Sequence, residues 1–217
     1  MNQSLAIDND ALLKLARYGL LNEALALFNC TSTNVSVLAT AKYKLLPAKN
    51  RLQLCKDEES ATRLEAFLRT SNQLDAGLAV GAGLANPDVF DTLNAVPDID
   101  TGEALLFAVG ANNSNILITT GDKRSLKALC SHDSVADISK ALTGRVVSIE
   151  VLFSMLADYQ FALIQERVRA KPDVDKTLKI VFGVKAPADF ESVKQGFASY
   201  INDLRSKTGT LLYLPSS

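Results

Sequence analysis

The stretch Leu5-Ala6-Ile7-Asp8-Asn9-Asp10-Ala11-Leu12 decides the fold, because a short apolar run passes directly into an amphipathic segment. Three consecutive apolar residues that end at an aspartate are typical of a buried strand. Over residues 11–28 the apolar side chains recur at helical spacing, and Asn9 or Asp10 can cap that helix. A strand followed at once by a helix is the repeating unit of an α/β fold.

The same alternation continues towards the C-terminus. We expect further strands at residues 35–37, 116–118, 145–149 and 178–182, and helices at residues 56–69, 104–110, 123–130, 150–169 and 190–204. Residues 75–86, rich in Gly and Ala, leave a helix and a loop both open. The pattern predicts an α/β fold with a mainly parallel central sheet and helices on both faces, in a Rossmann-like three-layer arrangement. The predicted core includes Leu12, Leu15, Ile116, Ile118, Val147 and Phe153.

A polar break at Lys171-Pro172-Asp173 divides the chain into two parts. We assign residues 1–170 to the α/β domain and residues 171–217 to a C-terminal extension that contains a helix and short strands. Nothing in the residue pattern of this extension indicates its role.

The composition limits the classes of function. The 217 residues are 47% hydrophobic and 22% charged, with a formal net charge of −1. This balance gives no global attraction to a polyanion, so a nucleic-acid partner requires a local basic patch. No apolar run approaches the ~20 residues that span a bilayer, and residues 1–10 lack the basic start of a signal peptide. We therefore expect no membrane partner.

Cysteine and histidine usage narrows the metal chemistry. Three well-separated cysteines without a CxxC pair fit a reducing, cytoplasmic environment and argue against a disulfide framework or a structural zinc site. His132 is the only histidine. Any metal centre within one chain would then rest on oxygen ligands, which favours Mg²⁺ or Mn²⁺.

Acidic side chains follow separate strands of the predicted sheet. Asp8 and Asp10 come after the first strand, and Asp122 comes after the strand at 116–118. Glu103 lies in the first turn of a helix that would face the same edge, where parallel α/β folds bind their ligands. Neighbouring carboxylates repel unless a cation lies between them, and a bound divalent cation activates water for attack on a phosphodiester. The acids therefore predict a divalent-metal site.

Basic residues near these acids are candidates for phosphate binding. Lys123, Arg124 and Lys127 follow Asp122 directly, and Thr120 precedes it. A second basic strip contains Lys42, Lys44, Lys49 and Arg51, of which Lys42 is a weaker candidate for the site.

Each acid also has a purely structural interpretation. Asp10 is a natural helix N-cap, and Asp122 can cap the helix that starts at Lys123. Asp100-Thr101-Gly102-Glu103 matches the capping pattern D-x-x-E.

Three segments together resemble the PIN-like domains, a metal-dependent nuclease fold found in many toxin ribonucleases. Ala6-Ile7-Asp8-Asn9-Asp10-Ala11-Leu12-Leu13 looks like that family's first strand with its catalytic Asp. Asp100-Thr101-Gly102-Glu103-Ala104 looks like the D-x-GEA segment, and Ile116-Leu117-Ile118-Thr119-Thr120-Gly121-Asp122-Lys123 looks like the strand that ends in T-x-D-K. The motifs occur in the family's order and span about residues 5–150.

This resemblance implies cleavage of single-stranded RNA with Mg²⁺ or Mn²⁺. It implies Asp8, Glu103 and Asp122 as catalytic metal ligands, Asp10 as an auxiliary ligand or a residue that positions water, and Asp100 as a weaker candidate. An antitoxin-like protein partner and a homodimer are left open by the resemblance.

One departure from the family's pattern keeps a non-enzymatic alternative open. PIN-like domains usually carry a Glu on the helix after the second strand, whereas residues 36–42 contain no acid here. The chain could thus be a catalytically weakened PIN-like binding module.

A second alternative is a haloacid-dehalogenase-like phosphatase. Asp8-Asn9-Asp10 has the D-x-D form, with Asp8 as the nucleophile. Its downstream acids would have to be Asp133 and Asp137, and the segment around Glu103 has no role in that reading.

Overall fold

The computed structural model describes residues 4–215, so the first three residues of the segment 1–10 lie outside it. In this part of the chain the strands form one sheet in the order β3-β2-β1-β4-β5, and every neighbouring pair is parallel. The strands are β1 (Ser4–Ile7), β2 (Val35–Leu38), β3 (Asn72–Leu74), β4 (Ile116–Thr120) and β5 (Val146–Ser148). The predicted parallel α/β fold is confirmed, and all strands end at the same edge of the sheet.

Helices occupy most of the remaining chain. They are α1 (Asn9–Tyr18), α2 (Leu21–Leu27), α3 (Ala41–Leu45), α4 (Leu52–Cys55), α5 (Glu58–Thr70), α6 (Ala76–Gly81), α7 (Pro87–Asn94), α8 (Thr101–Asn112), α9 (Lys123–Ser131), α10 (Ala136–Ala141), α11 (Ile149–Ala170), α12 (Lys176–Val181) and α13 (Phe190–Thr208). No helix of the described residues is long and apolar enough to cross a bilayer.

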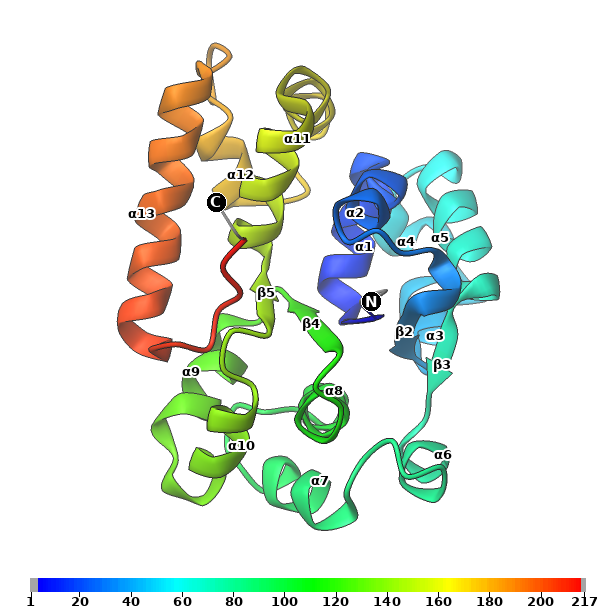
Figure 1. Cartoon of the computed structure of the whole chain (residues 1–217). Coiled ribbons are helices and arrows are strands. Elements are labelled where there is room, and N and C mark those ends of the chain that lie inside the picture. Colours follow the sequence, from blue (N-terminus) through cyan, green and yellow to red (C-terminus); the bar gives the residue numbers. More distant parts are fainter. Residues whose placement is uncertain (1–3, 216–217) are drawn as a thin grey trace.

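The sheet separates two helical layers (Figure 1). Helices α1, α2, α5 and α11 lie on one side of it, and α8 lies on the other side with α7 and α10 beyond. Helix α8 is buried almost all round because it is covered by the sheet on one side and by these helices on the other. The predicted helices on both faces are thus present.

The predicted core is largely confirmed. Leu12, Leu15, Ile118, Val147 and Phe153 are fully buried. Ile116 is only half-buried, because it begins β4 at the edge of the sheet opposite to the strand ends.

Two predicted elements are wrong. Residues 178–181 belong to α12 rather than to a strand, and Phe182 is its C-cap. Leu178, Val181 and Phe182 are buried at helical spacing, while Ile180 is exposed. The single helix predicted over residues 11–28 is two helices, because Gly19 adopts a left-handed conformation (φ 71°) that ends α1.

Other expectations are refined by the structure. Asp8, rather than Asn9 or Asp10, is the N-cap of α1. The undecided segment 75–86 contains α6, which Asp75 caps, followed by a turn. The predicted helix 150–169 is interrupted at Gln160, whose backbone is not helical.

The C-terminal extension packs back onto the α/β domain. Phe182 and Phe197 are fully buried, and the ring of Phe182 stacks on Phe161 of α11 with centroids 6.5 Å apart. The short strands expected here are reduced, in the described residues, to one bridge between Val146 and Leu212. Three ion pairs fasten the start of the extension to α1 and to the N-cap of α5: Arg17–Asp173 (2.5 Å), Lys14–Asp175 (2.8 Å) and Lys171–Asp57 (2.7 Å). We call these three pairs the seam.

Candidate active site

Asp8 stands at the end of β1, and its buried carboxylate binds two other segments. Its Oδ1 accepts a hydrogen bond from the backbone N–H of Ala11 (2.6 Å), which caps α1. Its Oδ2 accepts from the hydroxyl of Thr120 (2.5 Å) and from the backbone N–H of Gly121 (2.9 Å). Asp8 is therefore held against the end of β4, the neighbouring strand.

Thr120 connects Asp8 with Asp122. Its buried hydroxyl donates to Asp8 and accepts from the backbone N–H of Asp122 (3.0 Å). We expected Thr120 to bind substrate phosphate, but the structure uses its hydroxyl to fix two of the acids. Gly121 leaves room for a third acid, since a Cβ there would lie only 2.1 Å from Oδ2 of Asp10.

Glu103 approaches the same place from the first turn of α8. Its Oε2 accepts from the backbone N–H of Asp100 (3.0 Å), and Asp100 Oδ1 accepts from the N–H of Glu103 (2.9 Å). This is the capping box that the pattern D-x-x-E predicts. Gly102 lets the helix start close to β2, because a Cβ there would meet Leu38 at 2.7 Å.

The acids line one cleft at the strand ends. A cavity of about 190 Å³ is lined by Asp8, Asp10, Glu103 and Asp122, together with Lys44 from α3. A neighbouring cavity of about 230 Å³ shares Glu103 and Asp122 with it. We call the first cavity the carboxylate cleft. The three acids predicted to bind metal, and the auxiliary Asp10, thus converge from β1, β4 and α8.

Burial opposes the charge of Asp8. It raises the pKa of this carboxyl to about 6, although the hydrogen bonds from Thr120 and Ala11 act in the other direction. The negative charge of Asp10 raises the pKa further. Among the described residues, no lysine, arginine or histidine forms an ion pair with Asp8.

Among the acids of the cleft, Glu103 has the most strongly raised pKa. Burial, together with the charges of Asp122, Asp100 and Asp8, raises its pKa to about 8. Asp122 differs: burial alone would raise its pKa, but hydrogen bonds from the first turn of α9 hold the pKa below its ordinary value. The cleft therefore combines Asp122, whose pKa is lowered, with Asp8 and Glu103, whose pKa values are raised.

The predicted basic residues take different positions. Arg124 contacts Asp122 Oδ2 (3.3 Å) and lines the neighbouring cavity, whereas Lys44 lines the cleft itself. Lys123 is engaged elsewhere, because its ammonium pairs with Glu150 (2.5 Å). Lys42 lines a separate cavity beside α3, which is described below.

Glu150 is a fourth acid at this edge of the sheet that the sequence reasoning did not select. It lies two residues after β5, is 3% exposed, and its Oε2 has no hydrogen-bond partner among residues 4–215. Its position after a strand is the same signal that identified Asp8. Because Lys123 already neutralises it, Glu150 does not add an uncompensated charge.

The chemistry of the cleft's donors fits a hard divalent cation. Within the described chain, no group of three acidic, histidine or cysteine side chains is arranged to hold one metal ion. Mg²⁺, however, usually keeps several waters and takes only one or two protein carboxylates besides substrate phosphate. Glu103 and Asp122, which line both cavities, supply such a pair, with Asp8 next to them.

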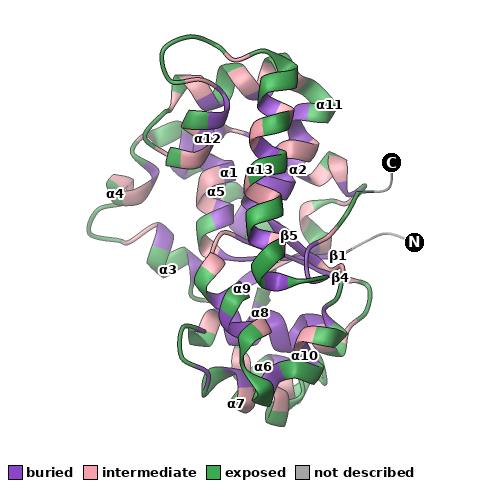
Figure 2. Ribbon diagram, turned by 90° about the vertical axis from the view of Figure 1, so that its left-hand side faces the viewer, coloured by how far each residue is buried: buried purple, intermediate pink, exposed green. Residues whose placement is uncertain are grey.

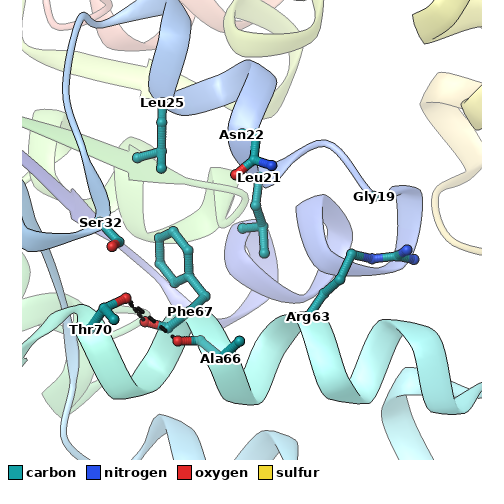
Figure 3. Close-up of a pocket in the computed structure, with 9 residues that line it drawn as sticks. All are labelled: Gly19, Leu21, Asn22, Leu25, Ser32, Arg63, Ala66, Phe67 and Thr70. Atoms are coloured by element: carbon teal, nitrogen blue, oxygen red, sulfur yellow. Dashed lines mark hydrogen bonds between the residues drawn. The ribbon is translucent and has the colours of Figure 1, made fainter.

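A different cavity, of about 300 Å³, lies between α2 and α5 away from the acids (Figure 3). Phe67 and Leu25 form its apolar wall, and Arg63 reaches along it towards Gly19. The guanidinium of Arg63 already donates to the carbonyl of Ala16 (3.2 Å) and pairs with Glu59. Without an acid in its lining, this cavity offers no chemistry comparable to that of the carboxylate cleft.

The chain matches no protein-family model, no curated protein and no solved structure. The resemblance to PIN-like domains thus remains a hypothesis that rests on the three motifs.

Proposed function

We propose that the protein is a Mg²⁺- or Mn²⁺-dependent endoribonuclease that hydrolyses phosphodiester bonds of single-stranded RNA. The observation that carries this proposal is the convergence of Asp8, Glu103 and Asp122 in one cleft. Asp8 and Glu103 have raised pKa values and no ion-pair partner in the described chain. Two buried acids that have no ion-pair partner are expected where an external cation binds.

Glu103 and Asp122 would hold the ion, and Asp8 would complete its acidic surroundings. The bound ion would supply a water of lowered pKa and neutralise the charge that develops on the phosphodiester. Asp10 lines the cleft and is exposed; its Oδ2 pairs with Lys14 (2.6 Å), which leaves Oδ1 to orient the attacking water. Thr120 acts through the acids, because its hydroxyl keeps Asp8 and the backbone of Asp122 in place.

Two cations are positioned to hold the substrate's phosphates. Lys44 lines the carboxylate cleft, and Arg124 lines the neighbouring cavity. Both side chains are exposed and can bind an anion without first breaking a buried ion pair. Helix α3, which carries Lys44, is the helix after the second strand, where the PIN-like pattern has an acid.

Cleavage of labelled single-stranded RNA in the presence of Mn²⁺ tests the proposal. Because removal of second-sphere groups alone typically costs 10–100-fold at metal sites, we expect Asp122→Asn to reduce the cleavage rate by more than about 100-fold. Asparagine still caps a helix, so the fold should persist. The matched control is Asp189→Asn, which alters the N-cap of α13 on an exposed surface outside the cleft lining and should cleave like the wild type. Cleavage that survives in Asp122→Asn would end the nuclease proposal.

The two alternatives give different results in the same assay. A binding module would retain RNA without cutting it in either protein. A phosphatase would instead hydrolyse a phosphate monoester and form a phosphoryl bond to Asp8. The geometry favours this reading less, because both oxygens of Asp8 already accept hydrogen bonds and neither Asp133 nor Asp137 lines the cleft.

A further inference from the structure

The cavity beside α3 that Lys42 lines borders the carboxylate cleft. It has a volume of about 400 Å³ and lies between α3, the end of α5 and the edge strand β3. Leu38 lines the cleft and the next residue, Ala39, lines this cavity. In the same way Lys44 lines the cleft while Tyr43 lines the cavity, so helix α3 forms the boundary between them.

This cavity lies at the edge of the sheet where the strands end. Helix α3, on the left of Figure 2, begins three residues after the end of β2. The strand ends, the acids and α3 therefore share one edge. Consecutive Cα atoms are about 3.8 Å apart, so adjacent residues of α3 bring the two cavities within reach of one extended oligonucleotide.

Tyr43 adds an exposed aromatic ring to the lining of the cavity. Its side chain is 78% exposed, and its ring pairs with no other aromatic ring of the described residues. Leu68 supplies an apolar floor, and Gln73 supplies a polar edge. Aromatic rings exposed beside a groove are the surfaces on which single-stranded nucleic acids stack their bases.

The charge around Tyr43 suits a phosphate backbone. Lys42 and Lys44 flank it on α3, and Arg69 lines the cavity with a side chain that is 75% exposed. Glu65 is the one acid in this lining, and its carboxylate is shared between Arg51 (3.1 Å) and Arg69 (3.3 Å). A local basic patch is thus present on a chain whose net charge is −1.

We propose that this cavity receives an unpaired base of single-stranded RNA, stacked on Tyr43, while the adjoining phosphate passes Lys44 into the carboxylate cleft. The inference rests on the proposed nuclease function and adds the subsite that holds the substrate beside the reacting phosphate. A volume of about 400 Å³ lies within the range of small-ligand sites, ~300–1,000 Å³, and leaves room for one base. Duplex RNA keeps its bases paired and cannot use this subsite.

Binding without cleavage tests this inference separately from the proposed function. The fluorescence anisotropy of a labelled single-stranded RNA oligonucleotide is measured in EDTA, so that no metal-dependent cleavage occurs. We expect Tyr43→Ala to weaken binding about 5- to 150-fold, the loss of one stacked base. Tyr43→Phe retains the ring and should bind within about twofold of the wild type. Since Tyr43 is exposed, neither change should disturb the fold.

The controls distinguish a base subsite from general attraction. Tyr159→Ala removes another exposed tyrosine, on α11, and should leave binding unchanged. Any binding of duplex RNA should be equal in the wild type and Tyr43→Ala. The inference is overturned if Tyr43→Ala binds single-stranded RNA as the wild type does, or if the wild type does not bind it. In the first case cleavage that depends on Asp122 would still support the nuclease, and only the base subsite would be lost.

Discussion

Aspartates cap helices both in the carboxylate cleft and in the seam, yet the pKa of Asp8 is raised and that of Asp57 is lowered. Asp8 caps α1 in the cleft, and Asp57 caps α5 in the seam, each through an oxygen that accepts a backbone N–H. Burial raises the pKa of Asp8 to about 6. Burial acts in the same direction on Asp57, but the ammonium of Lys171 and the hydrogen bonds from Ser60 lower its pKa to about 2.

Helix capping therefore does not account for the raised pKa values in the cleft. A helix N-terminus stabilises a carboxylate in both regions, and every seam acid pairs with a lysine or arginine. In the cleft, Asp10 pairs with Lys14 and Asp122 with Arg124, whereas Asp8 and Glu103 have no ion-pair partner among the described residues. Asp8 and Glu103 are also more deeply buried than the seam acids, which increases the cost of leaving them without a counter-charge. The seam therefore has the properties of a structural contact, whereas Asp8 and Glu103 lack a counter-charge, as the proposed metal site requires.

The largest expected effect on stability concerns Glu103. Its pKa is raised from the ordinary 4.5 to about 8, so between these pH values the folded protein holds more protons than the unfolded chain. The free energy of unfolding of the metal-free protein should thus decrease as the pH rises through this window. Glu103→Gln removes the charge and keeps an acceptor for the capping box. It should be about 1–3 kcal/mol more stable than the wild type above pH 8.

Urea denaturation at several pH values, in EDTA, measures this difference. Glu166→Gln is the matched control, since Glu166 is exposed on α11, and its curve should follow that of the wild type. Parallel curves for the wild type and Glu103→Gln would mean that the cleft carries no uncompensated charge.

A smaller effect should follow from Lys44→Glu, which places an acid on the helix where the PIN-like pattern has one. The substitution replaces the only cation that lines the carboxylate cleft, among the described residues, by a potential ligand. We expect Mg²⁺ to bind about tenfold more tightly, because the number of ligand charges tunes divalent-cation affinity. Isothermal titration calorimetry measures the change, with Lys49→Glu on a neighbouring exposed turn as the control. Equal affinity in all three proteins would place the metal away from α3.

The smallest effect is expected in the seam. The pKa of Asp57 is lowered from the ordinary 3.8 to about 2, so the pair with Lys171 stabilises the fold above pH 3.8 and loses this effect as the pH falls towards 2. Both side chains are about one-third exposed, and solvent screening limits the contribution to about 1 kcal/mol or less at pH 7. Thermal unfolding of Lys171→Ala should show this loss at pH 7 and none near pH 2. A loss that is independent of pH would show that packing, and not the ion pair, is responsible.

Part of this site could be predicted from the sequence. Parallel strands end at one edge, so the acids that follow β1 and β4 could be expected at the same edge, but their proximity depends on the pairing of these two strands. The role of Thr120 could not be predicted, because it depends on the register that pairs Ile7 with Thr119. Residues 178–182 were misassigned because a short apolar run does not distinguish a strand from a buried helix. Glu150 was missed because it was considered only as the start of a long helix, although it also follows β5 by two residues.

The pKa of Glu103, measured by ¹³C NMR of its carboxyl group with and without saturating Mg²⁺, tests the central claim most directly. Without the ion we expect this pKa near 8. With Mg²⁺ it should fall below its ordinary value, since a nearby cation favours the ionised carboxylate. A pKa that stays near 8 in saturating Mg²⁺ would contradict the claim that the cleft takes its missing positive charge from a metal ion.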